Sequence, residues 1–340
     1  FTYYSLASTG RDIKFDVGRT EGFRNFCNKI WNAARYAMMN SEGKPLSPEW
    51  NPAEFSSADR WIISRLEQTT DDVLTALADY RFDLASQSLH EFIWNEYCDW
   101  YLELSKPILW DEENNPQAAQ ATRRVLLTVL ERSLRLLHPF MPFLTEEIWQ
   151  KLAPLINIKG DSIMLQPYPE FDPAQIDEVA QAEIDWLKGI ILAIRNIRGE
   201  MDISPARSIR AFLRGSDAQD KNFLQLNWVY LQKLAKLESI EWLSPDDATP
   251  TCATGLHNNV EVLVPLAGLI DVSAEAARLE KEIGKLEAGL KSVTGKLSNE
   301  KFVSNAPDAV VAKEHAKQKE MQAALTALRS KLDELNNLPA

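Results

Sequence analysis

The strongest constraint on the fold is a periodic pattern of apolar residues near the C-terminal end of this 340-residue chain. From residue 272 to 297, and again from 321 to 335, apolar side chains recur alternately every fourth and every third position, which is the a/d pattern of a coiled coil. The short break between the two runs, at Phe302–Pro307, favours an antiparallel hairpin within one chain over a parallel dimer. Residues 269–340 are therefore predicted to form an arm roughly 40 Å long. The two runs are Val272, Ala276, Leu279, Ile283, Leu286, Leu290, Val293 and Leu297, then Met321, Leu325, Leu328, Leu332 and Leu335.

Residues 19–153 show apolar stripes at helical spacing, separated by polar or proline-bearing loops. Successive helices with short connections predict an α-helical bundle. Ser57 is the N-cap candidate of the second helix, and the third, covering 84–104, is expected to stop near Pro107. The stripes contain Phe26, Ile30, Ala33 and Ala37; Trp61, Leu66, Thr70, Leu74 and Leu77; Phe92, Trp100, Tyr101 and Leu104; Leu126, Leu130, Leu134 and Leu137; and a short fifth segment covers 140–152.

Residues 154–268 have a different composition, which begins with a proline-bearing linker. Helical patterns cover 177–200 and 222–237, and strand-like patterns cover 209–214, 239–243 and 260–265. We predict a small mixed α/β module with antiparallel strands. The fold class is thus mainly α: a helical bundle, a small α/β module and a C-terminal antiparallel coiled-coil hairpin.

The formal net charge of −12 argues against a protein that binds nucleic acid over its whole surface, because polyanions repel an acidic protein. No apolar run reaches the length of a membrane-spanning helix. Three widely spaced cysteines form neither a disulfide framework nor a zinc pattern, which favours the reducing cytoplasm.

Motifs that carry catalytic chemistry are missing from the sequence. The four histidines lie far apart, there is no glycine-rich phosphate loop, and the paired carboxylates lie in polar surroundings. We therefore predict no catalytic residue, no metal site and no cofactor site in this chain. The histidines are His90, His138, His257 and His315, and the acidic pairs are Asp71-Asp72, Glu112-Glu113 and Asp246-Asp247.

Residues 1–40 differ from the rest of the chain in charge. They contain six Lys or Arg against three acids, a local charge of +3, with five aromatic residues nearby. Cations beside aromatic rings suit single-stranded RNA, because charge binds phosphate and rings stack on unpaired bases. A helix with aromatic residues in the core and solvated arginines is the alternative. The cations are Arg11, Lys14, Arg19, Arg24, Lys29 and Arg35; the aromatic residues are Phe15, Phe23, Phe26, Trp31 and Tyr36.

Several ordered segments resemble the valyl-tRNA synthetase family. The segment 6–13 is similar to the one that follows the catalytic domain in that family, and 25–36 resembles the first helix of its anticodon-binding bundle. Residues 58–62, 95–103 and 138–143 are similar to later landmarks of the bundle. The final hairpin, with Phe302-Val303 and Ala306-Pro307 at its tip, resembles the C-terminal coiled coil of bacterial members.

The resemblance implies a division of labour among these segments. The bundle would receive the anticodon loop of tRNA(Val), and Arg19, Lys29 and Tyr36 match positions that the family places at the anticodon. Arg24 and Arg35 are weaker candidates, and Arg35 could equally form a salt bridge within the bundle. The arm would contact the outer corner of the tRNA through Arg278, Lys281, Lys285 and Lys291. Arg195 and Arg198 are possible contacts to the RNA backbone.

The catalytic motifs of the family have no counterpart in this sequence. Residues 1–18 resemble the tail of the connection to the catalytic domain, so we expect this chain alone to be inactive and ATP to be used by the catalytic domain of the parent enzyme. The implied protein is a cytoplasmic valine–tRNA ligase portion, monomeric and without membrane contact. Two alternatives are open: the same region of an isoleucyl-like synthetase, which often ends in a cysteine-rich zinc module, or a helical scaffold whose coil dimerises.

Overall fold

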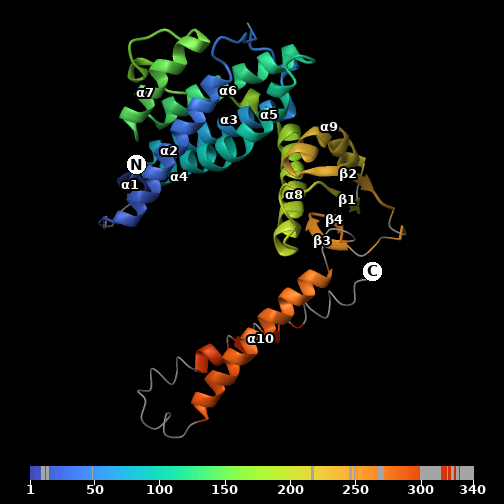
Figure 1. The fold of residues 1–340 in the computed structure, drawn as a ribbon. Helices are drawn as coiled ribbons and strands as arrows, with labels where there is room; N and C mark the ends of the chain where they lie inside the picture. Colours follow the sequence, from blue (N-terminus) through green and yellow to red (C-terminus); the bar gives the residue numbers. More distant parts are fainter. Residues whose placement is uncertain are drawn as a thin grey trace. The chain divides into compact units, whose positions relative to one another are not determined.

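A computed structural model shows a mainly helical chain with one small mixed sheet (Figure 1). It describes residues 1–8, 12, 15–47, 49–215, 218–244, 247–248, 250, 252–266, 272–298, 315–319, 321–322, 325–326 and 329. The chain divides into two compact units, Phe1–Ile191 with Asp217–Ala235, and Leu192–Ser216 with Lys236–Ala340. The predicted combination of a helical bundle and a small α/β module is confirmed, and the predicted domain limits stay a prediction.

The first unit is a helical bundle whose core contains most of the predicted stripe residues, but Leu74, Leu77 and Trp100 are only half-buried. Phe26 and Ile30 are buried on the second helix, and Leu126 and Leu130 on the sixth. The helices are α1 (Thr2–Leu6), α2 (Val17–Met39), α3 (Ser57–Ala78), α4 (Phe82–Glu91), α5 (Leu102–Trp110), α6 (Pro116–Leu137), α7 (Pro142–Leu152) and α9 (Ala218–Leu234), with part of α8 (Glu178–Glu200). Short 3-10 turns are η1 (Pro52–Glu54), η3 (Ala153–Ile156), η4 (Ile163–Leu165) and η5 (Pro173–Gln175).

A π-helix, η2 (Phe92–Tyr101), joins α4 to α5 without a break in the chain direction. The apolar periodicity predicts one helix here and gives no sign of the π-helical turns. The helical run continues past Pro107, which lies inside α5, and ends at Trp110. Two tyrosine hydroxyls anchor η2 to its neighbours: Tyr97 donates to the carbonyl of Leu126 at 2.9 Å, and Tyr101 donates to Asp59 at 2.5 Å.

The N-terminus of α3 is closed by a capping box centred on Ser56. The Ser56 hydroxyl accepts a hydrogen bond from the backbone N–H of Asp59, and the Asp59 carboxylate accepts one from the backbone N–H of Ser56. The prediction that Ser57 is the N-cap is therefore wrong: Ser57 is the first helical residue. Asp59 stands three positions after Ser56, and that spacing makes the reciprocal pair possible.

Asp59 is fully buried and accepts hydrogen bonds from several elements of the bundle. Besides the Ser56 backbone, its carboxylate accepts from the Ser56 hydroxyl at 2.7 Å, from Tyr101 at 2.5 Å and from Thr122 of α6 at 2.8 Å. Burial raises the pKa of this carboxyl, and the hydrogen bonds from Tyr101, Ser56 and Thr122 oppose that rise. The side chain thereby joins α3, η2 and α6 at one buried point.

Two further buried carboxylates attach α7 and the following linker to the bundle. Glu131 of α6 accepts from the indole N–H of Trp149 at 2.9 Å and from Arg135. Glu67 of α3 pairs with Arg132 and accepts from the backbone N–H of Asp172 at 2.9 Å. Glu131 and Glu67 each have an arginine partner, as expected of charges removed from water.

The second unit contains a four-stranded sheet in the order β2-β1-β4-β3. β1 (Ile209–Arg214) pairs with β4 (Val260–Pro265) in antiparallel fashion, as does β3 (Cys252–His257) with β4, but β1 and β2 (Leu237–Trp242) are parallel. The prediction of an antiparallel sheet is therefore wrong for this pair. α9 lies between β1 and β2 in the sequence, and a helical crossover of this kind connects parallel strands.

β3 is a strand that the sequence pattern does not predict, and it packs closely against the end of α8. A Cβ atom at Gly255 of β3 would lie 3.3 Å from both Ala193 Cβ and Ile197 Cδ1. The absence of a side chain lets the helix approach the strand at this point. A two-residue turn with Asn258 at φ 51° connects β3 to β4.

The arm begins with α10 (Val272–Leu297), the long helix drawn in orange in Figure 1. Ile283 and Val293, two residues of the predicted repeat, are buried, as is Leu325. The described residues between 315 and 329 run antiparallel to α10, because Gln318 donates to Thr294 at 3.0 Å while Arg329 donates to Glu287 at 2.6 Å. The predicted break and tip lie outside the described residues, as do Leu328, Leu332 and Leu335.

We expect Asp59→Ala to lower the free energy of unfolding by about 2–4 kcal/mol, because it leaves the Tyr101 and Thr122 hydroxyls buried without an acceptor and removes the reciprocal half of the α3 capping box. Urea unfolding of the purified chain measures this loss. Asp71→Ala is the control, since Asp71 is an exposed acid on the same helix and should change stability by less than about 0.5 kcal/mol. Equal losses for the two variants would contradict the role given to Asp59.

Candidate nucleic-acid interface

Helix α2 carries all five residues that are expected at the anticodon, and its core face determines where they lie. The Asp16 side chain caps the helix by accepting from the backbone N–H groups of Gly18 and Arg19. Phe26 and Ile30, together with Ala33, Ala34 and Ala37, form the buried side of the helix. With 3.6 residues per turn, the side chains outside this stripe divide into an outer face and a flank next to η2 and α5.

Arg24 and Arg35 lie on the outer face, directed away from the buried stripe. They are eleven positions apart, which is about three turns, so they share one side of the helix. Both are exposed, and neither forms an ion pair within the described part of the chain. This arrangement gives two solvated guanidinium groups that can bind RNA phosphate.

Trp31 lies between these two arginines on the same outer face, and our sequence prediction did not include it in the site. Its side chain is 40% exposed, and the Lys151 ammonium lies 5.3 Å from the centre of its ring. An exposed indole between two arginines offers a surface on which a base can stack. The helical spacing of Arg24, Trp31 and Arg35 is the sequence signal that would have identified it.

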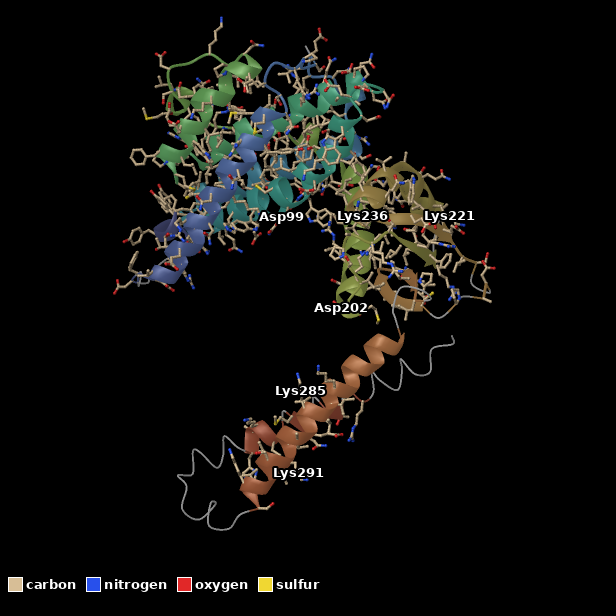
Figure 2. All side chains as sticks on the ribbon, in the orientation of Figure 1. Asp99, Asp202, Lys221, Lys236, Lys285 and Lys291 are labelled. Carbon is tan, nitrogen blue, oxygen red and sulfur yellow. The ribbon has the colours of Figure 1, made fainter. Side chains whose placement is uncertain are left out.

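Lys29 lies on the flank of α2, where η2 holds its ammonium group. The Nζ atom is 2.6 Å from Asp99 Oδ1 and 3.8 Å from the centre of the Trp94 ring. The Lys29 side chain is 22% exposed and that of Asp99 48%; Asp99 is labelled in Figure 2. This predicted RNA contact is thus paired within the protein.

Tyr36 lies on the same flank, further along the helix, and is half-buried. Its hydroxyl oxygen is buried without a hydrogen bond of normal geometry, and the Lys106 ammonium lies 5.8 Å from its ring. Burial raises the pKa of this hydroxyl. The ring is therefore a partly covered surface rather than a free stacking platform.

Arg19, in the first turn of α2, is exposed, and its Nε lies 3.9 Å from Asp16. The structure therefore places Lys29 with Tyr36, places Arg24 with Arg35, and leaves Arg19 apart from both pairs. Which of them contact RNA stays a prediction.

On the arm, Lys281, Lys285 and Lys291 of α10 are exposed and form no ion pair with another described residue. Lys285 and Lys291 are labelled in Figure 2. The side chain of Arg278 lies outside the described residues. Lys281 and Lys285, one turn apart, lie on one side of the helix, and Lys291, six positions further on, points to another side.

Arg198 is not a surface contact. Its side chain is buried and donates to the carbonyl groups of Ser204, Arg207 and Lys236 at 2.9–3.0 Å. The prediction that it contacts RNA is wrong, because its guanidinium holds the segment after α8 next to the start of β2.

Two features are absent from the part of the chain that the structure describes. No group of three or more His, Cys, Asp or Glu side chains could hold a metal ion. None of the helices is both long and apolar enough to cross a membrane.

Two family models match the chain. The anticodon-binding domain of tRNA ligase matches residues 59–213, so the domain in this part of the chain is of the aminoacyl-tRNA synthetase class. The valyl tRNA synthetase tRNA binding arm matches residues 271–336. In this order the two matches identify the chain as a C-terminal valyl-tRNA synthetase-like portion.

A solved structure that is similar to part of the chain is the ternary complex of Agrobacterium radiobacter K84 agnB2 LeuRS with tRNA and LeuAMS. The identity is 15% and the TM-score 0.35, and the match covers 52% of this chain and 20% of that chain.

Helix α2 precedes residues 59–213, which the first family model matches, and packs on them: the rings of Phe26 and His90, for example, have their centres 4.5 Å apart.

We expect Tyr36→Phe to change the free energy of unfolding by less than about 0.5 kcal/mol, because the hydroxyl that it removes has no hydrogen bond of normal geometry to lose. Tyr36→Ala should cost about 1–3 kcal/mol, because it removes the half-buried ring. Thermal unfolding of both variants measures these changes. A large loss in Tyr36→Phe would show that the hydroxyl is bonded.

Proposed function

We propose that this chain is the tRNA-recognising C-terminal part of a valine–tRNA ligase. The bundle receives the anticodon loop of tRNA(Val), and the arm contacts the outer corner of the tRNA. ATP-dependent aminoacylation belongs to the catalytic domain of the parent enzyme, and the chain alone does not charge tRNA. We place the protein in the cytoplasm, as a monomer.

The observation that carries this proposal is the outer face of α2, where Trp31 lies between two exposed arginines. Anticodon bases are unpaired, so they can stack on an indole while guanidinium groups bind the flanking phosphates. Lys29 and Tyr36 extend the same helix surface toward η2. The net charge of −12 does not oppose this binding, because residues 1–40 carry +3 and salt limits electrostatic interactions to about 8–10 Å.

The arm supports the proposal through its charge and its packing. Lys281, Lys285 and Lys291 are exposed, so they can bind phosphate without reading sequence. Ile283 and Val293 are buried in the contact with the returning segment of the same chain. Because these apolar residues are already covered by the same chain, they are not free to pair with a second copy. This favours a tRNA-binding arm over a scaffold that dimerises through the same residues.

Valine is favoured over isoleucine by one of the two family matches. The model that matches residues 271–336 is that of the valyl arm.

We expect the chain to bind tRNA(Val) at least about fivefold more tightly than the same tRNA with a swapped anticodon, because each lost stacking or base contact costs roughly 1–3 kcal/mol. Filter binding at low salt, with both RNAs in parallel, measures the ratio. Equal affinity for the two RNAs defeats the claim of anticodon recognition.

We expect the triple variant Lys281→Gln, Lys285→Gln and Lys291→Gln to weaken the binding of both RNAs by the same factor. The dependence of log affinity on log salt should become shallower by about 1 for each lysine that contacts phosphate. The control triple replaces Lys159, Lys221 and Lys236, which are exposed and lie outside α2 and the arm (Figure 2). The same loss in the control would show that only total charge matters.

A further inference from the structure

The π-helix η2 builds a binding place for the ammonium group of Lys29. Hydrogen bonds in a π-helix join residues five positions apart, so Trp94 and Asp99 lie on the same side of η2. In an α-helix, five steps of 100° would place them roughly 140° apart. The Trp94 ring and the Asp99 carboxylate therefore contact one ammonium group together, at 3.8 Å and 2.6 Å.

Asp99 is bound less tightly by the protein than the buried acids of the bundle. Its side chain is 48% exposed, and Lys29 is its only ion-pair partner among the described residues (Figure 2). Glu67 and Glu131, in contrast, are buried and each bind two groups. An exposed ion pair of this kind contributes little to stability, so a competing anion can replace the carboxylate.

The anion that the proposed function brings to this flank is RNA phosphate. Carboxylate and phosphate both offer anionic oxygen atoms to an ammonium group. Arg24 and Arg35 on the outer face have no such internal competitor within the described residues. Lys29 is thus the candidate contact on α2 that must exchange one anion for another.

We propose that Asp99 is a built-in competitor of RNA phosphate for Lys29. In the free chain the carboxylate holds the ammonium against Trp94, and bound RNA takes its place. This exchange lowers the affinity of the chain for every RNA whose phosphate contacts Lys29. It does not change the affinity for an RNA that makes no contact with Lys29. This inference rests on the proposed function, because it takes RNA to be the ligand of α2.

The test is a double-mutant cycle of the full chain with Asp99→Asn, Lys29→Met and both changes together. Filter binding of tRNA(Val) at low salt should show that Asp99→Asn strengthens binding by about two- to fivefold, the range that an exposed ion pair is worth. In the Lys29→Met background the same change should have no effect, because the competed cation is absent. Asp99→Glu, which keeps the charge, should bind like the unaltered chain.

Glu21→Gln is the matched control, since Glu21 is an exposed acid on α2 itself. If Asp99→Asn strengthens binding equally with and without Lys29, and Glu21→Gln does the same, Asp99 acts only through general repulsion and the proposal is overturned. No change in Asp99→Asn while the chain binds tRNA overturns it as well.

Thermal unfolding of the same four proteins separates this failure from that of the proposed function. The two changes should be non-additive in the unfolding temperature, because the ion pair exists without RNA. Additive changes overturn the competitor directly. If the changes are non-additive but the chain binds no tRNA, the ion pair forms and the proposed function is wrong. RNA is then not the ligand of α2, so the competition proposal fails with the proposed function.

Discussion

The buried carboxylate of Asp59 is the constraint on which the bundle depends. It is fully buried and accepts hydrogen bonds from Ser56 at the start of α3, from η2 and from α6. Tyr101, one of its donors, is the last residue of the π-helix η2, and Asp99 of the same π-helix contacts Lys29 of α2. Tyr97 attaches η2 to α6 through its hydrogen bond to the Leu126 carbonyl. A side chain that caps one helix therefore also sets the position of the surface that faces Lys29.

The distribution of charge reconciles an acidic protein with an RNA-binding role. Residues 41–270 carry a formal charge of −15, whereas residues 1–40 carry +3 and residues 271–338 have equal numbers of acids and bases, which together give the chain's −12. Within the bundle, several acids are neutralised by arginines that hold the core together. Exposed cations are present on both α2 and α10, and phosphate responds to charge within about one Debye length.

The sequence predicts what local periodicity determines and misses what depends on distant partners. The stripes of α2 and α6 predict their buried faces, because the helical period alone decides them. The parallel pairing of β1 with β2 depends on the crossover through α9, and β3, with its Gly255 and few apolar residues, has a weak strand pattern. In the candidate site, the burial of Tyr36 and the pairing of Lys29 with Asp99, 70 positions away, arise only when η2 and α5 pack against α2.

The central claim is that α2 meets the anticodon loop, and a crosslinking experiment tests it most directly. A photoreactive uridine in the anticodon loop of tRNA(Val) is irradiated in complex with the chain, and the attached peptide is identified by mass spectrometry. The account predicts attachment within α2, at or beside Trp31 on its outer face. Attachment to the arm or to the sheet, with α2 unlabelled, would contradict it.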